Sequence, residues 1–208
     1  MLGNPILDLV FRSWPKHALF AASRLKIFTV LASRAMTAAE LSKGISAEPR
    51  IFTALLDACV GMGLVQLKNG VYSNSHLADA YLVEGRPLYM GDMIEVQATE
   101  AADWHRLYDV IIGNAKAGTA TSRAEVGPRC FTLAMNSLAM LGEAEALAAA
   151  VDLSECRTMV DVGCGSGMYS VALCRRHPDL TSVLLDRKEV LQVAREIVKR
   201  HKLQDRIN

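Results

Sequence analysis

The sequence predicts a mainly α domain of the winged-helix type, followed by the first part of a doubly wound, Rossmann-like α/β domain. Three short helical patterns between residues 18 and 63 lead into a short hairpin pattern. Residues 158–208 then alternate two apolar strand patterns with two helical patterns. That alternation is typical of a parallel sheet with crossover helices.

The composition is that of an ordinary folded protein. Of its 208 residues, 51% are apolar and 22% charged, and the net charge is +1. So small a charge gives no electrostatic reason to expect a nucleic acid or a membrane as a partner. The five cysteines include no CxxC pair, which argues against a disulfide framework and against a structural zinc site. We therefore expect a cytoplasmic protein without a metal.

The opening residues predict an amphipathic helix. Apolar residues recur at helical spacing, while Asp8, Arg12 and Lys16 interrupt any run long enough for a signal peptide or a membrane span. Pro15 is expected to kink or end the helix. The apolar stripe either packs on its own domain or mediates dimerisation of the chain.

Residues 21–75 predict the winged helix in order. A helix over 21–33 is followed by one capped by Thr37 and by a third with Pro49 near its first turn. Asn69 and Gly70 then separate two short alternating runs, which is the strongest short signal for a hairpin.

The charge of this region argues against DNA recognition. Only Arg50 is available on the third helix to read bases, and the region from Met36 to Ser75 has no net charge. A dimerisation and substrate-lid domain is the favoured interpretation. The charged residues counted are Lys43, Arg50, Lys68, Glu40, Glu48 and Asp57.

Further helices are predicted between the hairpin and the α/β region. The patterns indicate helices over 75–83, 87–113 and 129–151, with a loop over 114–128. We expect a dimerisation domain over 1–100, connecting helices over 101–157 and the α/β domain over 158–208.

A glycine turn after the first α/β strand indicates a nucleotide cofactor. Asp161 lies within the strand, and the turn has the pattern Gly-x-Gly-x-Gly, with Met168 at the position where a dinucleotide site needs its third glycine. The spacing therefore favours S-adenosylmethionine over NAD, with a structural turn as the alternative. The turn glycines are Gly163, Gly165 and Gly167.

The second strand ends in a carboxylate suited to a ribose. Asp186 lies 23 residues after Gly163, where it can accept hydrogen bonds from both ribose hydroxyls. Arg187 beside it is expected near the adenine. Taken alone, Asp186 could equally be a solvated strand end.

Five segments give the chain a resemblance to a known family, the small-molecule S-adenosylmethionine-dependent O-methyltransferases of the plant caffeate, hydroxyindole and bacterial polyketide-tailoring type. The chain resembles the amino-terminal portion of the members of that family. The segments are LKIFTVLASRAMTAAELSKGISAEPRIFTALLDACVGMGLV, the helix with Trp104, FTLAM, VDVGCGSG and LLDRKEVLQVA.

The resemblance implies a class I methyltransferase domain, a homodimer formed through the amino-terminal domain, and methylation of a small aromatic or polyketide-like acceptor. It also implies Phe131 and Met135 as acceptor-site candidates. The chain departs from the family at Cys164, which we interpret as a packing residue, and at Arg187-Lys188.

The resemblance places the catalytic histidine of the family on a later loop, so we assign no catalytic residue and expect the chain to be a fragment of a longer enzyme. A truncated, non-catalytic dimerisation or regulatory protein is the alternative. A DNA-binding regulator is a weaker one. The histidines considered are His17, His76, His105, His177 and His201, of which the last two are expected to be solvated helix caps.

Overall fold

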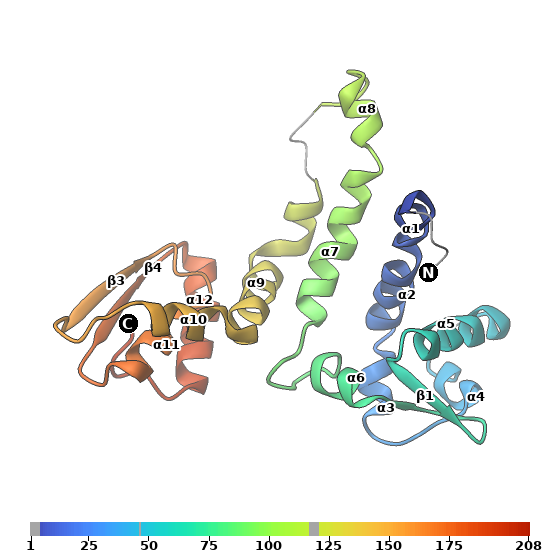
Figure 1. Cartoon of the computed structure of the whole chain (residues 1–208), viewed down its shortest axis with the longest axis horizontal. Helices are drawn as coiled ribbons and strands as arrows, with labels where there is room; N and C mark the ends of the chain where they lie inside the picture. The colour runs from blue at the N-terminus through green and yellow to red at the C-terminus, as the bar shows by residue number, and fades with distance from the viewer. Residues whose placement is uncertain (1–4, 46, 117–120) are drawn as a thin grey trace. The chain divides into compact units, whose positions relative to one another are not determined.

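The computed structural model describes residues 5–45, 47–116 and 121–208. The chain divides into two compact units, Met1–Ala98 and Thr99–Asn208 (Figure 1). The division falls within α7 (Gly91–Trp104). The other described elements of the first unit are α1 (Pro5–Phe11), α2 (Ser13–Arg24), α3 (Ile27–Leu31), α4 (Ala38–Ser42), α5 (Pro49–Gly61), β1 (Val65–Lys68), β2 (Val71–Asn74) and α6 (His76–Tyr81).

The first unit has the predicted winged-helix order, with α3, α4 and α5 followed by the antiparallel hairpin β1–β2. Asn69 and Gly70 form its two-residue turn, with φ values of 51° and 77°. A turn with two positive φ values matches the twist of the strands it joins. Met36 adds an antiparallel bridge to Tyr72, whose N–H donates to the Met36 carbonyl at 2.7 Å.

Local capping explains where the helices of this unit begin. Thr37 caps α4 in a capping box, in which the Glu40 N–H donates to Thr37 Oγ1 at 3.2 Å and the Thr37 N–H to Glu40 Oε2 at 2.8 Å. Pro49 opens α5 as predicted, and Glu48 is its N-cap. Phe28 and Leu56 lie fully buried in the core of the unit.

The prediction of one helix over 21–33 was wrong. Lys26 adopts a left-handed backbone with φ of 54°, which separates α2 from α3. The turn brings both Ile27 and Phe28 into the core, and the Lys26 ammonium pairs with Glu84 at 2.9 Å. The helix predicted over 87–113 is likewise divided, because a tight turn in which the Arg106 N–H donates to the Asp103 carbonyl separates α7 from α8.

The predicted loop over 114–128 and helix over 129–151 also need correction. Residues 121–126 are helical and join the following helix across Gly127, whose φ of 74° bends the chain. Gly142, with φ of 119°, interrupts the next helix within the π-helical turn η1 (Ala139–Glu143). The other elements of the second unit are α8 (Leu107–Ile111), α9 (Thr121–Leu138), α10 (Ala144–Ala150), β3 (Thr158–Val162), α11 (Met168–Arg176), β4 (Thr181–Leu185) and α12 (Lys188–Arg200).

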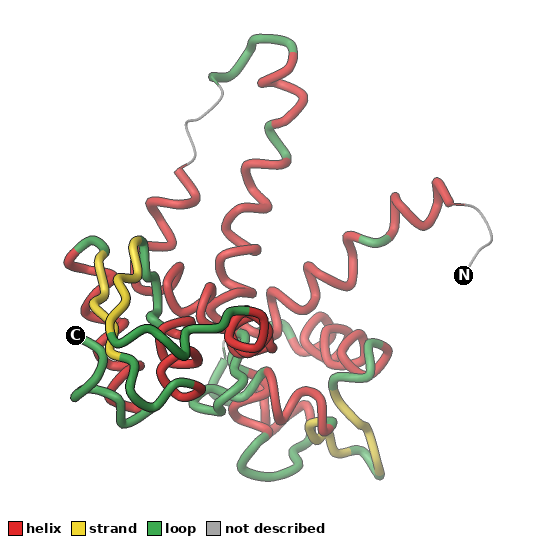
Figure 2. Tube along the Cα trace, turned by 60° about the vertical axis from the view of Figure 1, so that its left-hand side comes forward, coloured by secondary structure: helices red, strands yellow, loops and turns green. Residues whose placement is uncertain are grey.

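The strands of the second unit form the predicted parallel sheet. β3 and β4 run side by side (Figure 2). Asp161 lies opposite Leu184, and Ile207 forms a further parallel bridge to Ser182. Buried residues of α10, α11 and α12 form one core with Leu184. The side chains that point to the other face of the sheet are exposed, and they are Val160, Val162, Val183 and Leu185.

Arg206 binds the carboxyl end of α11 through hydrogen bonds. Its guanidinium donates to the backbone carbonyls of Cys174 at 2.6 Å, His177 at 3.2 Å and Leu180 at 3.4 Å, and also to that of Pro178. The last carbonyls of a helix lack partners within the helix. Arg206 therefore satisfies these groups and holds the loop between α11 and β4.

Candidate functional site

The site is built where β3 turns into α11. Gly165 in this turn has φ of 55°, a conformation that few other residues adopt without strain. Gly167 has φ of 73° and is the N-cap of α11. A Cβ at Gly167 would lie 3.1 Å from Leu184 Cδ1, whereas one at Gly163 or Gly165 would meet no atom within 4 Å. The first two glycines of the turn therefore border open space.

Asp186 joins the end of β4 to this turn. Its Oδ2 accepts the Gly165 N–H at 2.9 Å, and its Oδ1 accepts its neighbour's N–H, that of Arg187, at 2.7 Å. Two backbone donors thus fix the carboxylate. Each oxygen keeps acceptor capacity for a further donor.

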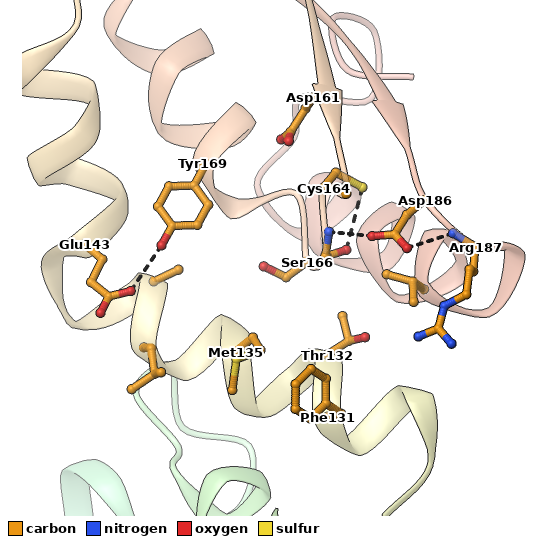
Figure 3. A pocket seen from close by; sticks show the side chains of 15 residues that line it. Phe131, Thr132, Met135, Glu143, Asp161, Cys164, Ser166, Tyr169, Asp186 and Arg187 are labelled. Atoms are coloured by element: carbon orange, nitrogen blue, oxygen red, sulfur yellow. Dashed lines mark hydrogen bonds between the residues drawn. The ribbon is translucent and has the colours of Figure 1, made fainter. Parts of the chain in front are cut away.

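A pocket of about 370 Å³ lies against this turn. Figure 3 shows Asp186 and Arg187 on one side of it, Tyr169 and Glu143 on the other, and Met135 below. All of its lining residues belong to the second unit. They are Phe131, Thr132, Met135, Leu138, Ala139, Glu143, Asp161, Gly163, Cys164, Gly165, Ser166, Tyr169, Asp186, Arg187 and Val190.

The pocket gathers most of the residues that the sequence singled out. Gly167 is the exception, since it does not line the pocket and instead lies in the packing between the turn and β4. The predicted residues that do line it are Asp161, Gly163, Gly165, Asp186, Arg187, Phe131 and Met135.

The sequence analysis missed four polar lining residues, namely Thr132, Glu143, Ser166 and Tyr169. The Tyr169 hydroxyl donates to Glu143 Oε2 at 3.1 Å. Burial, and secondly this bond to a carboxylate, raise the pKa of Tyr169. The position of Tyr169, two residues beyond the glycine turn, was the one available signal for it.

The charge of the lining is negative. Glu143, Asp161 and Asp186 supply three carboxylates against the single guanidinium of Arg187, a net of −2. Burial raises the pKa of the Cys164 thiol to about 11, and the neighbouring carboxylates of Asp161 and Asp186 add to the shift. The thiol is thus protonated at neutral pH, in keeping with the packing role expected of Cys164.

The histidines do not contribute to this lining. His105 is exposed. His177 and His201 are C-caps, of α11 and α12, but both are half-buried rather than solvated as predicted. Burial, and secondly the charges of Arg175 and Arg200, lower the pKa of His201. Across the described residues, no group of three or more histidine, cysteine or acidic side chains is arranged to hold a metal ion.

Two family models match the chain in succession. Residues 7–84 match the O-methyltransferase dimerisation domain, and residues 89–208 match the O-methyltransferase domain. The chain belongs to the O-methyltransferase family. This assignment confirms the predicted recognition and the predicted fold class.

Individual members of the O-methyltransferase family resemble the chain over most of its length. It is 32% identical to a 3-hydroxy-5-methyl-1-naphthoate 3-O-methyltransferase from Streptomyces sahachiroi, over 92% of this chain and 57% of the relative. It is 29% identical to a tetracenomycin polyketide synthesis 8-O-methyl transferase from Streptomyces glaucescens, over 97% of this chain and 62% of the relative. The chain thus spans about six tenths of the length of these relatives.

A solved structure agrees with the fold. Human N-acetylserotonin methyltransferase in complex with SAM superposes with a TM-score of 0.80 at 24% identity, over 98% of this chain and 63% of that one. Among the described residues, none of the helices combines the length and the hydropathy that a membrane-spanning helix requires.

Proposed function

We propose that the protein is an S-adenosylmethionine-dependent methyltransferase that acts on a hydroxyl group of a small aromatic or polyketide-like metabolite. The observation that carries the proposal is the hydrogen bond between Asp186 and the Gly165 N–H, which holds a carboxylate at the edge of an open glycine turn. The named activities of the naphthoate and tetracenomycin methyltransferases support the acceptor class.

The turn and its surroundings suit this cofactor. Asp186 would accept the two ribose hydroxyls with the acceptor capacity left on its two oxygens. Gly163 and Gly165 leave room for the cofactor against the backbone, and Arg187 would lie near the adenine. Asp161 would face the amino-acid end. When bound, the cofactor supplies a methyl group on a positively charged sulfonium, which suits a lining with a net charge of −2.

The acceptor would lie against α9. Phe131 and Met135 are four residues apart on this helix, so they share one face, and both line the pocket. An aromatic ring and a thioether offer a flat, polarisable surface to an aromatic acceptor. The chain's part in the reaction is to align the acceptor hydroxyl with the cofactor.

The amino-terminal domain would form a homodimer in the cytoplasm. Apolar side chains of α1 and the start of α2 are exposed, among them Leu9 at 67% and Trp14 at 66%. Apolar patches of this kind mark interaction surfaces. In this arrangement residues 1–100 dimerise, residues 101–157 connect, and residues 158–208 bind the cofactor. No nucleic-acid or membrane partner is proposed.

Calorimetry with S-adenosylmethionine tests the cofactor site on the 208-residue chain. We expect binding by the wild type, and a loss of about tenfold or more in Asp186→Ala, since a charge-assisted acceptor is removed. Asp179→Ala is the matched control, because Asp179 is an exposed carboxylate paired with Arg157 in the same unit, and it does not line the pocket. An absence of heat with the wild type would contradict the proposal.

Two further measurements test activity and assembly. Radiolabelled methyl transfer to a panel of hydroxylated naphthoates and other phenols should give labelled product with the wild type. Sedimentation velocity should show a dimer that Leu9→Asp weakens and Leu67→Asp, a change at an exposed apolar residue of the hairpin, leaves intact. A monomeric wild type would refute the homodimer.

A further inference from the structure

Asp161, Ser170 and Ser182 form a row of hydrogen-bonded side chains beside the glycine turn. Ser170 Oγ lies 2.6 Å from Asp161 Oδ2 and 2.9 Å from Ser182 Oγ. Ser170 is 0% exposed and Ser182 1% exposed, whereas Asp161 lines the pocket. A buried pair of hydroxyls thus ends in a carboxylate that borders the site.

The protons of this row have a single consistent arrangement. An ionised carboxylate only accepts hydrogen bonds, so the Ser170 hydroxyl donates to Asp161. Ser170 has one hydroxyl proton, and the Ser182 hydroxyl must therefore donate to Ser170 Oγ. Ser182 is itself fixed in the sheet, where its N–H donates to the Arg206 carbonyl at 2.8 Å and its carbonyl accepts the Asn208 N–H at 3.0 Å.

This arrangement leaves one carboxylate oxygen for a ligand. Oδ2 of Asp161 is held by Ser170, and Oδ1 receives no hydrogen bond from the described residues. The buried hydroxyls therefore fix the orientation of the carboxylate without using both of its oxygens. Because Ser170 lies on α11 and Ser182 on β4, the orientation of the Asp161 carboxylate depends on two elements that follow the glycine turn in the chain.

We propose that Ser170, supported by Ser182, is a positioning residue that aims the Asp161 carboxylate at the ammonium group on the amino-acid end of the cofactor. This inference rests on the proposed function, because it assigns a role within the same cofactor site. It predicts that loss of the Ser170 hydroxyl weakens recognition of the ammonium group and leaves recognition of the nucleoside unchanged.

Two ligands distinguish recognition of the ammonium group from recognition of the nucleoside. S-adenosylhomocysteine carries the ammonium group, and 5′-methylthioadenosine carries the same nucleoside without the amino-acid end. Calorimetry on Ser170→Ala should show S-adenosylhomocysteine binding weakened about tenfold, the loss expected for a hydrogen bond to a charged group. Binding of 5′-methylthioadenosine should change less than twofold.

Other variants exclude a merely structural role. Ser182→Ala should give a smaller change in the same direction, because Ser170 still donates to Asp161. In an Asp161→Asn background, Ser170→Ala should add little further loss, since the group that it positions has been altered. Ser137→Ala is the matched control, a buried serine of the same unit whose hydroxyl donates to the Leu133 carbonyl and which does not line the pocket.

The outcomes are distinguishable. Weaker binding of S-adenosylhomocysteine by Ser170→Ala, with binding of 5′-methylthioadenosine unchanged, supports the inference. Equal weakening of both ligands, or of neither, in a chain whose wild type binds both would overturn the inference and leave the proposed function standing. A wild type that binds neither ligand would contradict the proposed function and this inference with it.

Discussion

The carboxylate of Asp186 accepts the backbone N–H of Gly165 at 2.9 Å, across 21 residues of sequence. The bond joins the end of β4 to the turn that follows β3, so the two halves of the proposed cofactor site are linked within the protein itself. The same carboxylate accepts the Arg187 N–H at 2.7 Å. Its position is therefore set by the backbone before any ligand is considered.

The substitution Asp186→Asn tests this link in the absence of ligand. An amide has one acceptor oxygen, so it cannot accept both backbone N–H groups as the carboxylate does on its two oxygens. We expect the Gly165 amide hydrogen to exchange about tenfold faster, as measured by NMR-detected hydrogen exchange. Asp179→Asn should leave that rate unchanged, and an unchanged rate in both variants would show that the bond does not hold the turn.

The substitution Gly167→Ala should destabilise the second unit. The φ of 73° costs a residue with a Cβ about 1–2 kcal/mol, and the new methyl would lie 3.1 Å from Leu184 Cδ1. Gly113→Ala is the control for backbone strain alone, because Gly113 has φ of 80° and open space around it. Urea denaturation should show a larger loss in the free energy of unfolding for Gly167→Ala than for Gly113→Ala. Equal losses would contradict close packing of Leu184 against Gly167.

Cys164 should react slowly with alkylating agents. Cys164 is 5% exposed, and burial raises the pKa of its thiol to about 11, so little of it is the reactive thiolate at pH 8. Peptide mapping after brief treatment with iodoacetamide should find the exposed Cys156 modified well before Cys164. Equal rates in the native protein would contradict the packing role.

The capping box of α4 predicts an acid-dependent contribution to stability. The Thr37 N–H, followed by Arg34 and the Thr37 hydroxyl, lowers the pKa of Glu40 from its usual 4.5 to about 2. Because the pKa is lower in the folded state, this contribution is complete above about pH 4.5 and is lost as the pH falls toward 2.

A carbon-13 NMR titration of the Glu40 carboxyl measures this directly. The midpoint should lie near pH 2, and in Arg34→Gln it should move upward because one hydrogen-bond donor is removed. A wild-type midpoint near 4.5 would mean that the capping box is not formed in solution.

The features predicted from the sequence are those that depend on local chemistry. Asn69 and Gly70 fix a hairpin because they tolerate positive φ, and Thr37 fixes a helix start through its own hydroxyl. The glycine turn after β3 follows the same principle, since the positive φ values of Gly163, Gly165 and Gly167 favour glycine. Each of these signals needs only a few neighbouring residues.

The missed features depend on tertiary context. Lys26 adopts a left-handed conformation although it is not glycine, because the turn brings Ile27 and Phe28 into the core. Glu143 lines the pocket from the π-helical turn η1, an interruption of the helix that the apolar pattern did not predict. Apolar periodicity carries no information about either event.

Arg206, which gathers the carbonyls at the end of α11, has a consequence for binding. With Ser170 tied to Asp161 near the start of the helix and Arg206 at its end, α11 is fastened at both ends. These bonds restrain α11 before a ligand binds, and restraint of a binding element in advance lowers the conformational entropy that is lost on association.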